Sequence, residues 1–337
     1  MTKKQPKTPK SLSVRRRILL PLVALLVAEL ALLCTVVLGS GLLTQLNEAA
    51  KSTMHSRVRS RASYLQAEMV NRWSNIGHTM DKVNLLYSDL CAQGTLTPET
   101  LTSDPAQYST FLTAATPALI EMMRTGSVTG AMLTLNPAGY SAGALPQEVA
   151  LPCLYLRDRD PVSAYNAGNG DLLFEYAPVG TVKALSISCD SNWLPLLRFA
   201  KGECYPDYLT QPYNAILQNP ALTPALCGYW SLPHTVASST EIVITYTVPL
   251  VAQDGSVYGT LSTEILLSYL RTLLSPAELS DGDSALYALY TSAALPGAAP
   301  VQTPVLLCGS AYEASLTHTV LSQILPDAES AYSQRLV

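Results

Sequence analysis

The sequence has little charge: Asp, Glu, Lys and Arg together make up only 14% of its 337 residues. Hydrophobic residues make up 48%, a proportion that excludes a largely disordered chain. The first 17 residues contain no acid at all, whereas seven of them are Lys or Arg. The small charge that the chain does carry is therefore unevenly placed, and its basic part stands at the N-terminus.

The sequence also lacks the usual signatures of catalysis. It has only four histidines, and they are dispersed: His55, His78, His234 and His318. None lies in an HExxH or nucleophile-elbow pattern, and no glycine-rich phosphate loop or zinc-type Cys/His spacing is present. We therefore predict no catalytic residue, no metal and no cofactor. For His234, which follows Pro233 close to Tyr229 and Trp230, we expect a surface position; contact with a ligand is the alternative.

Seven cysteines leave the disulfide state open. Cys34 lies in an apolar run and is not expected to pair. The other six allow 15 connectivities, with Cys189–Cys204 and Cys204–Cys227 the closest pairs in sequence. Buried free thiols are an equal alternative. The six are Cys91, Cys153, Cys189, Cys204, Cys227 and Cys308.

Residues 18–39 form the one long apolar run, and 22 residues suffice for a helix that crosses a bilayer. The basic segment before the run predicts that the N-terminus is cytoplasmic and the bulk of the chain extracytoplasmic, at the plasma (inner) membrane. The core of a cleaved signal peptide is shorter, roughly 7–15 residues. We therefore expect an uncleaved anchor rather than a signal peptide.

The part of the chain after the anchor is acidic. Residues 40–337 carry 14 Lys and Arg against 24 Asp and Glu, a balance of −10. Because binding to phosphate backbones needs a basic face, this balance argues against nucleic acid as a partner.

Hydrophobic periodicity predicts one long helix over residues 42–90, followed by a sheet region rich in Pro and Gly. We expect strands at 129–135, 151–156, 182–188, 241–248 and 257–265, and helices at 106–124 and 265–274. Strands at 284–291 and 304–311 would open a second sheet, with a helix at 314–324. The predicted fold class is α+β.

The segments GYWS (228–231), ITYTVPL (244–250) and DGSVYGTLSTEI (254–265) resemble the double Cache family of extracytoplasmic sensor domains in bacterial receptors. The segment NRWSNI (71–76) is similar to the entry helix of that family. The resemblance covers roughly residues 18–311. It implies a PAS-like antiparallel sheet that binds a small ligand, and a smaller membrane-proximal sheet that passes the signal to a cytoplasmic diguanylate cyclase, histidine kinase or chemotaxis module.

The expected organisation is a basic tail (1–17), a transmembrane helix (18–39), a stalk helix (40–91), a membrane-distal ligand-binding domain (92–268) and a membrane-proximal subdomain (269–337). No output module is recognisable, and the proximal sheet looks incomplete, so we expect a truncated receptor or a fragment; a standalone sensor is the alternative. Signalling through the anchor and stalk predicts a homodimer.

Aromatic and polar side chains around the hairpin motif are the candidate ligand-binding residues. Tyr and Trp offer flat apolar walls with one polar tip, which suits a small molecule. Adjacent strand residues point to opposite faces, so at most one of Thr245 and Tyr246 lines a given pocket. The candidates are Tyr229, Trp230, Thr245, Tyr246, Tyr205 and Asp207.

Members of the family that bind amino acids grip the amine with an aspartate and the carboxylate with an arginine. Asp207, in a segment expected to be a loop, is a possible amine partner. The usual arginine is absent before Tyr229, which argues against amino acids. We expect Arg157 and Arg159 to form a solvated turn with their neighbouring aspartates, and Glu264 to be structural.

Two other classes of function remain as alternatives. An anchored extracytoplasmic hydrolase would need a catalytic cluster that only folding brings together. A surface interaction protein would lack an enclosed polar pocket.

Overall fold

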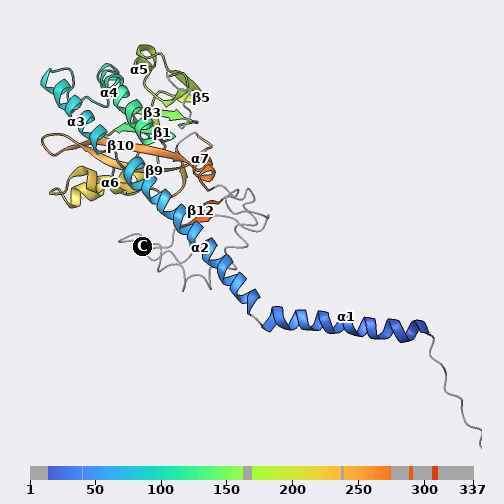
Figure 1. Ribbon diagram of the computed structural model, residues 1–337. Coiled ribbons are helices and arrows are strands. Elements are labelled where there is room, and N and C mark those ends of the chain that lie inside the picture. Colours follow the sequence, from blue (N-terminus) through green and yellow to red (C-terminus); the bar gives the residue numbers. More distant parts are fainter. Residues whose placement is uncertain are drawn as a thin grey trace, which may run out of the picture. The chain divides into compact units, whose positions relative to one another are not determined.

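The computed structural model describes residues 14–39, 41–161, 169–236, 239–274, 288–290 and 306–309, the last two ranges as backbone only. The chain divides into two compact units, one that extends to Arg61 and one that begins at Ala62. Helices α1 (Val14–Gly39) and α2 (Leu42–Glu68) account for the described part of the first unit, and α2 continues into the second (Figure 1).

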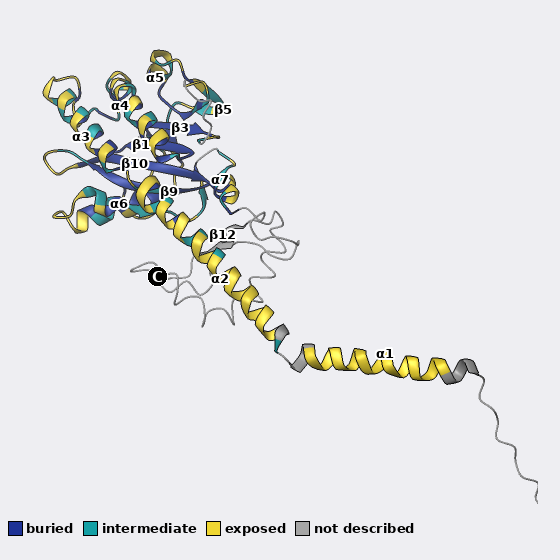
Figure 2. Ribbon diagram, in the orientation of Figure 1, coloured by how far each residue is buried: buried dark blue, intermediate teal, exposed yellow. Residues whose placement is uncertain are grey.

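Helix α1 contains the predicted apolar run. Its segment Ile18–Val36 is long and apolar enough to cross a membrane, judged by length and composition. Every described side chain in that segment is exposed (Figure 2).

The helix predicted over 42–90 is interrupted. After α2 the chain makes a π-helical turn, η1 (Met69–Trp73), and a new helix, α3 (Gly77–Ala92), begins after three intervening residues. The Trp73 carbonyl accepts a hydrogen bond of 2.7 Å from the Thr263 hydroxyl in the sheet. This bond ties the carbonyl end of the π-helical turn to the sheet at the point where the helix is interrupted.

A mostly antiparallel sheet forms the centre of the second unit. Its order is β5-β4-β3-β1-β10-β9-β7, with β8 also paired to β9 and only β4 and β5 parallel. The strands of this sheet are β1 (Gly130–Leu135), β3 (Cys153–Asp158), β4 (Leu172–Tyr176), β5 (Ser188–Leu194), β7 (Tyr229–Trp230), β8 (His234–Thr235), β9 (Ile242–Val251) and β10 (Val257–Leu266). The sheet and its helices confirm the α+β fold with an antiparallel PAS-like sheet.

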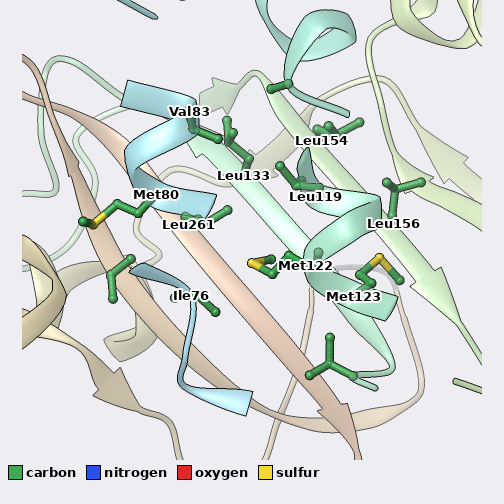
Figure 3. Packing of buried hydrophobic residues seen from close by; sticks show 14 of the residues in the cluster. Ile76, Met80, Val83, Leu119, Met122, Met123, Leu133, Leu154, Leu156 and Leu261 are labelled. Carbon is green, nitrogen blue, oxygen red and sulfur yellow. The ribbon is translucent and has the colours of Figure 1, made fainter. Parts of the chain in front are cut away.

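One face of the sheet is covered by α3 and α4 (Pro105–Gly126). Leu133, Leu156 and Leu261 point from three neighbouring strands toward these helices. In Figure 3 they meet Met80 of α3 and Met122 of α4. This face holds the larger hydrophobic core, and we call it the helix face.

The opposite face is covered by α6 (Asp207–Gln218) and by a small sheet of β2 (Val149–Leu151) and β6 (Leu197–Phe199). The core here is rich in tyrosine, including Tyr140, Tyr155 and Tyr208. We call it the polar face, because the strands present hydroxyl and charged side chains to it. Shorter helices, α5 (Val179–Ala184), η2 (Pro224–Cys227) and α7 (Leu267–Thr272), complete the unit.

The predicted strands at 129–135, 241–248 and 257–265 and the helix at 106–124 are confirmed to within a few residues. The strand at 151–156 lies two residues further on, and α7 falls within the helix predicted at 265–274. The strand predicted at 182–188 is wrong: α5 takes its first three residues, and β5 begins only at its last residue, Ser188. The segment around Asp207, expected to be a loop, opens α6 with an apolar side packed on β9 and β10.

Near the C-terminus, β11 (Ala288–Tyr290) pairs with β12 (Leu306–Gly309), inside the two segments predicted to open a second sheet. The helix predicted at 314–324 lies outside the described residues. The six cysteines whose side chains are described are free thiols: Cys34, Cys91, Cys153, Cys189, Cys204 and Cys227.

Trp73 has no exposed surface and anchors the turn between α2 and α3. We expect Trp73→Ala to lower the free energy of unfolding by about 3–5 kcal/mol, because it removes a large buried side chain and leaves a cavity. Val70→Ala, at a 60% exposed position one turn away, is the matched control and should change it by less than about 0.5 kcal/mol. Urea titration measures both; equal effects would contradict the burial of Trp73.

Candidate functional site

The polar face of β9 and β10 carries a row of hydroxyl groups where a simple core would carry apolar side chains. The Thr247 and Ser262 hydroxyls share a hydrogen bond of 2.8 Å, and Thr260 lies 3.5 Å from the Tyr140 hydroxyl. All are buried. Because a buried polar group is costly unless it is bonded, such a row marks a surface selected for more than packing.

Arg157 of β3 is the centre of a charged cluster on the same face. Its side chain is 1% exposed and its guanidinium reaches three carboxylates: Glu175 at 2.9 Å, Glu241 at 2.5 Å and Glu264 at 3.2 Å. The Tyr155 hydroxyl bonds both Arg157 and Glu264. Strands β3, β4 and β10 and the loop before β9 thus meet at one cation.

A glycine makes this cluster possible. Gly130 of β1 lies between Arg157 and Glu264, directly opposite both in the strand register. A Cβ at Gly130 would stand 3.0 Å from Glu264 Oε1 and 3.0 Å from the Leu156 carbonyl. The missing side chain leaves the space through which the guanidinium crosses β1 to reach the carboxylate.

One guanidinium cannot neutralise three carboxylates, so the cluster is deficient in positive charge. Burial raises the pKa of Glu264 well above its usual value. Burial also raises the pKa of Glu175, where the nearby Arg157 opposes the shift and the charges of Asp190 and Glu241 add to it. Both carboxyl groups therefore release their protons at a higher pH than a free glutamate does.

A cleft of about 580 Å³ lies between β4, β6, α6 and β8, and no residue of the charged cluster lines it. Tyr176 forms part of its wall and stacks on Tyr155 of the cluster, with 6.3 Å between the ring centroids. The cleft is lined by Tyr176, Leu194, Arg198, Phe199, Glu203, Cys204, Pro206, Tyr208 and Thr235. Its size and mixed lining suit a small polar molecule.

Four of the six predicted ligand-binding residues lie on the polar face. Thr245 is buried opposite Glu264, and Tyr229 pairs with Thr247. Tyr205 is 8% exposed and packs edge-on against Tyr140 and Phe199. The fourth, Asp207, is exposed at the start of α6. The pKa of Tyr229 is raised chiefly by the burial of Tyr229 and further by the negative charge of Asp207.

Trp230 and Tyr246 lie on the helix face instead. Their rings are 5.2 Å apart and both pack against the larger core. The structure therefore does not bring the six residues together at one place, and none of them is among the residues that line the cleft. Thr245 and Tyr246 do point to opposite faces, as strand geometry requires.

Arg157 is the clearest correction to the sequence analysis. It was expected in a solvated turn with Arg159, but β3 continues to Asp158 and turns Arg157 inward. Its partners stand 18, 84 and 107 residues away along the chain, so no local pattern indicates the pairing. Arg159 is 59% exposed, as expected. The interpretation of Glu264 as structural agrees with its buried ion pair.

His234 also departs from its expected surface position. Its ring stacks on Tyr208, with 4.5 Å between centroids, and burial lowers the pKa of the imidazole. Tyr176 was missed as a wall residue, whereas Tyr208, which also lines the cleft, belongs to the aromatic segment around Asp207 that the sequence had singled out. Alternation in LLFEY (172–176) would have placed Tyr176 with Leu172 and Phe174 on the helix face, but an irregularity in the pairing of β3 with β4 turns it to the polar face.

No family model matches the chain, and no curated protein matches it. Among solved structures it is similar to a methyl-accepting chemotaxis protein X, with 16% identity over 85% of this chain and 83% of that chain and a TM-score of 0.41. The ligand-binding domain of the Campylobacter jejuni chemoreceptor Tlp3, in complex with 4-methylisoleucine, has 12% identity, coverages of 71% and 66%, and a TM-score of 0.35.

A third similar structure is the extracellular domain of the putative histidine kinase soHK1S-Z6, with 16% identity over 81% of this chain and 84% of that chain and a TM-score of 0.31. These identities and TM-scores are too low to transfer a function. We therefore propose a function from the residues of this chain alone.

Arg157→Ala should lower the free energy of unfolding by about 3–5 kcal/mol, because it leaves buried carboxylates without their cation. Arg159→Ala is the matched control, because Arg159 is also an arginine and lies only two residues further along the chain. Its nearest carboxylates are 3.8 Å away and it is mostly solvated, so the change should stay below about 1 kcal/mol. Urea unfolding at pH 7 measures both; a small loss for Arg157→Ala would contradict the buried cluster.

The raised carboxyl pKa values predict how stability depends on pH. Above about pH 4.5, the ordinary value for glutamate, the unfolded chain has lost protons that the native cluster still holds. The free energy of unfolding should then fall as pH rises through the window up to the native pKa.

Glu264→Gln removes one of these groups and should flatten that fall. Urea titrations from pH 4.5 to 7.5 provide the comparison, with Glu148→Gln, an exposed carboxyl on the same side of the fold, as the control. An unchanged slope in Glu264→Gln would show that Glu264 is ionised throughout this range.

Proposed function

We propose that this protein is the extracytoplasmic small-molecule sensor region of a membrane-bound signal-transduction receptor. The observation that carries the proposal is the polar face: a buried, bonded row of charges and hydroxyls next to an aromatic cleft of about 580 Å³. A core built only for stability would bury apolar side chains there, since a buried ion pair is often no more stable than its apolar replacement.

The double Cache resemblance supports the same function. The motif residues form the β9–β10 hairpin, and β10 carries Glu264 of the cluster. The division into a distal ligand-binding domain (92–268) and a proximal subdomain (269–337) follows from that resemblance and is part of the proposal. The six predicted ligand-binding residues are also part of the proposal. Tyr205, Asp207, Tyr229 and Thr245 are better supported than the other two, because they lie on the polar face.

Helix α1 and the basic tail support a membrane anchor with the N-terminus in the cytoplasm. A homodimer is part of the same proposal. On α2, Leu46, Met54 and Val58 are exposed apolar side chains at spacings that keep them near one side of the helix. We propose that a second copy covers them, and that ligand binding shifts the helix and acts on a cytoplasmic output module.

A thermal-shift screen tests the binding function. The full chain in detergent micelles is mixed with amino acids, small carboxylates, amines or purines, and a ligand of the native state must raise the melting temperature. Thr235→Trp, from an exposed position on the cleft wall, should abolish the shift by filling the cleft.

Val179→Trp, at an exposed position of α5 that does not line the cleft, should leave the shift unchanged. A shift that survives Thr235→Trp would place the ligand elsewhere. No shift from any compound, with cooperative unfolding intact, would count against small-molecule sensing.

A further inference from the structure

Cys204 places an exposed thiol in the wall of the cleft. It lines the cleft together with its chain neighbours Glu203 and Pro206, so one short segment forms this part of the wall. A bridge to Ala144 holds the backbone at this position. The thiol is free, so it is available for exchange with another sulfur compound.

The other described thiols outside α1 are less accessible. Cys91 and Cys189 are half-buried. Cys153 and Cys227 are buried. Burial raises the pKa of Cys153 to about 12, and it also raises the pKa of Cys189 and of Cys227. Since the thiolate is the form that attacks, these three thiols react slowly near neutral pH, and Cys204 is the accessible one.

A tyrosine in the same wall indicates that the cleft is equipped for an occupant. Tyr208 is 3% exposed and lines the cleft. Its hydroxyl makes no hydrogen bond with any residue that the structure describes, yet it is not among the fully buried atoms that lack a partner. The small surface that it keeps therefore faces the cleft. Burial raises the pKa of Tyr208, so the phenol keeps its proton and can donate it in a hydrogen bond to a molecule that enters.

We propose that Cys204 is a modification site for small disulfides that enter this cleft. The Cys204 thiolate attacks one sulfur of a disulfide RSSR. The bond between the two sulfurs of RSSR breaks, and a mixed disulfide forms between Cys204 and one RS group. The other half leaves as the thiolate RS⁻ and takes up the proton that the Cys204 thiol gave up. The disulfide is itself the oxidant, so no further reactant is needed.

The lining of the cleft defines the kind of R group that fits. Leu194 and Phe199 offer an apolar wall to a short stem, and the Tyr208 hydroxyl can donate to an acceptor at its end. The consequence for sensing rests on the proposed function. Small disulfides persist outside the cytoplasm, where the reducing thiols of the cytosol do not reach them. An RS group on Cys204 occupies the cleft, so the sensor binds its solute only while Cys204 is reduced.

Hydroxyethyl disulfide is the first probe, because it is small and uncharged and carries a hydroxyl acceptor. The full chain in micelles at about pH 8 receives a short pulse, and peptide mass spectrometry locates the adduct. A background of Cys34→Ser and Cys308→Ser keeps five thiols: Cys91, Cys153, Cys189, Cys204 and Cys227. Cys204 should be labelled at least about tenfold faster than any other. In urea all five should react at similar rates, and equal labelling in the native state would overturn the proposal.

The second measurement tests whether the reaction takes place in the cleft. Thr235→Trp, which fills the cleft from an exposed position on its wall, should slow the labelling of Cys204 at least about tenfold. Val179→Trp, at an exposed position of α5 that does not line the cleft, should leave the rate unchanged. Cooperative urea unfolding verifies that both variants fold. Equally fast labelling of Thr235→Trp and the wild type would overturn the reaction inside the cleft.

The third measurement distinguishes this proposal from the proposed function. A compound that raises the melting temperature in the screen of amino acids, small carboxylates, amines and purines should lose its effect after labelling with hydroxyethyl disulfide. Dithiothreitol should restore the effect, and Cys204→Ser should keep it throughout. A shift that survives complete labelling of Cys204 would overturn the control of sensing. A screen without any shift would count against small-molecule sensing, whereas the labelling rates decide the modification of Cys204 by themselves.

Discussion

The buried charge of Arg157 is the constraint on which much of the second unit depends. A guanidinium removed from water is tolerated only where carboxylates and hydroxyls replace the lost hydration. Here they come from β3, β4, β10 and the loop before β9, so all four segments must be in place together. The cluster is thus a condition on the order and register of the sheet as well as a group of contacts.

The two faces of the sheet contribute differently to the stability of the fold. The helix face, with Leu133, Leu261 and the methionines of α3 and α4, supplies the apolar burial that stabilises the unit. That burial offsets the cost of keeping hydroxyls and charges on the polar face. Because strand side chains alternate, each strand serves both faces at once: in β10, Thr263 bonds the Trp73 carbonyl on one side while Glu264 meets Arg157 on the other.

Structural features that depend on residues close together in the sequence could be predicted, and features that depend on residues far apart in the sequence could not. The β9–β10 hairpin was predicted because its signals are local: β-branched residues in EIVITYTV, then Asp254-Gly255 at the turn. The break at Trp73 was not predicted, and the tertiary bond made there comes from Thr263, 190 residues away in the sequence. The buried position of Arg157 was not predicted for the same reason, because its partners are distant in the sequence.

The candidate site was only partly predictable. Resemblance and side-chain chemistry pointed to the hairpin, and the period of two correctly separated Thr245 from Tyr246. Which of the two lies on the polar face could not be read from the sequence, since either side chain is compatible with burial on either face. Tyr176 and Tyr208 became wall residues only through the pairing of β3 with β4 and the packing of α6.

The alternation in β10 also protects the fold against mispairing. A slip of one residue against β1 would turn Glu264 into the hydrocarbon side of the sheet and bring Ile265 against the guanidinium of Arg157. Both errors leave a bare charge in an apolar surrounding, so the slipped state has no compensating contact. The alternation of polar and apolar side chains in β10 thus specifies the register of the strand. The same residues that form the polar face also destabilise the wrong alignment.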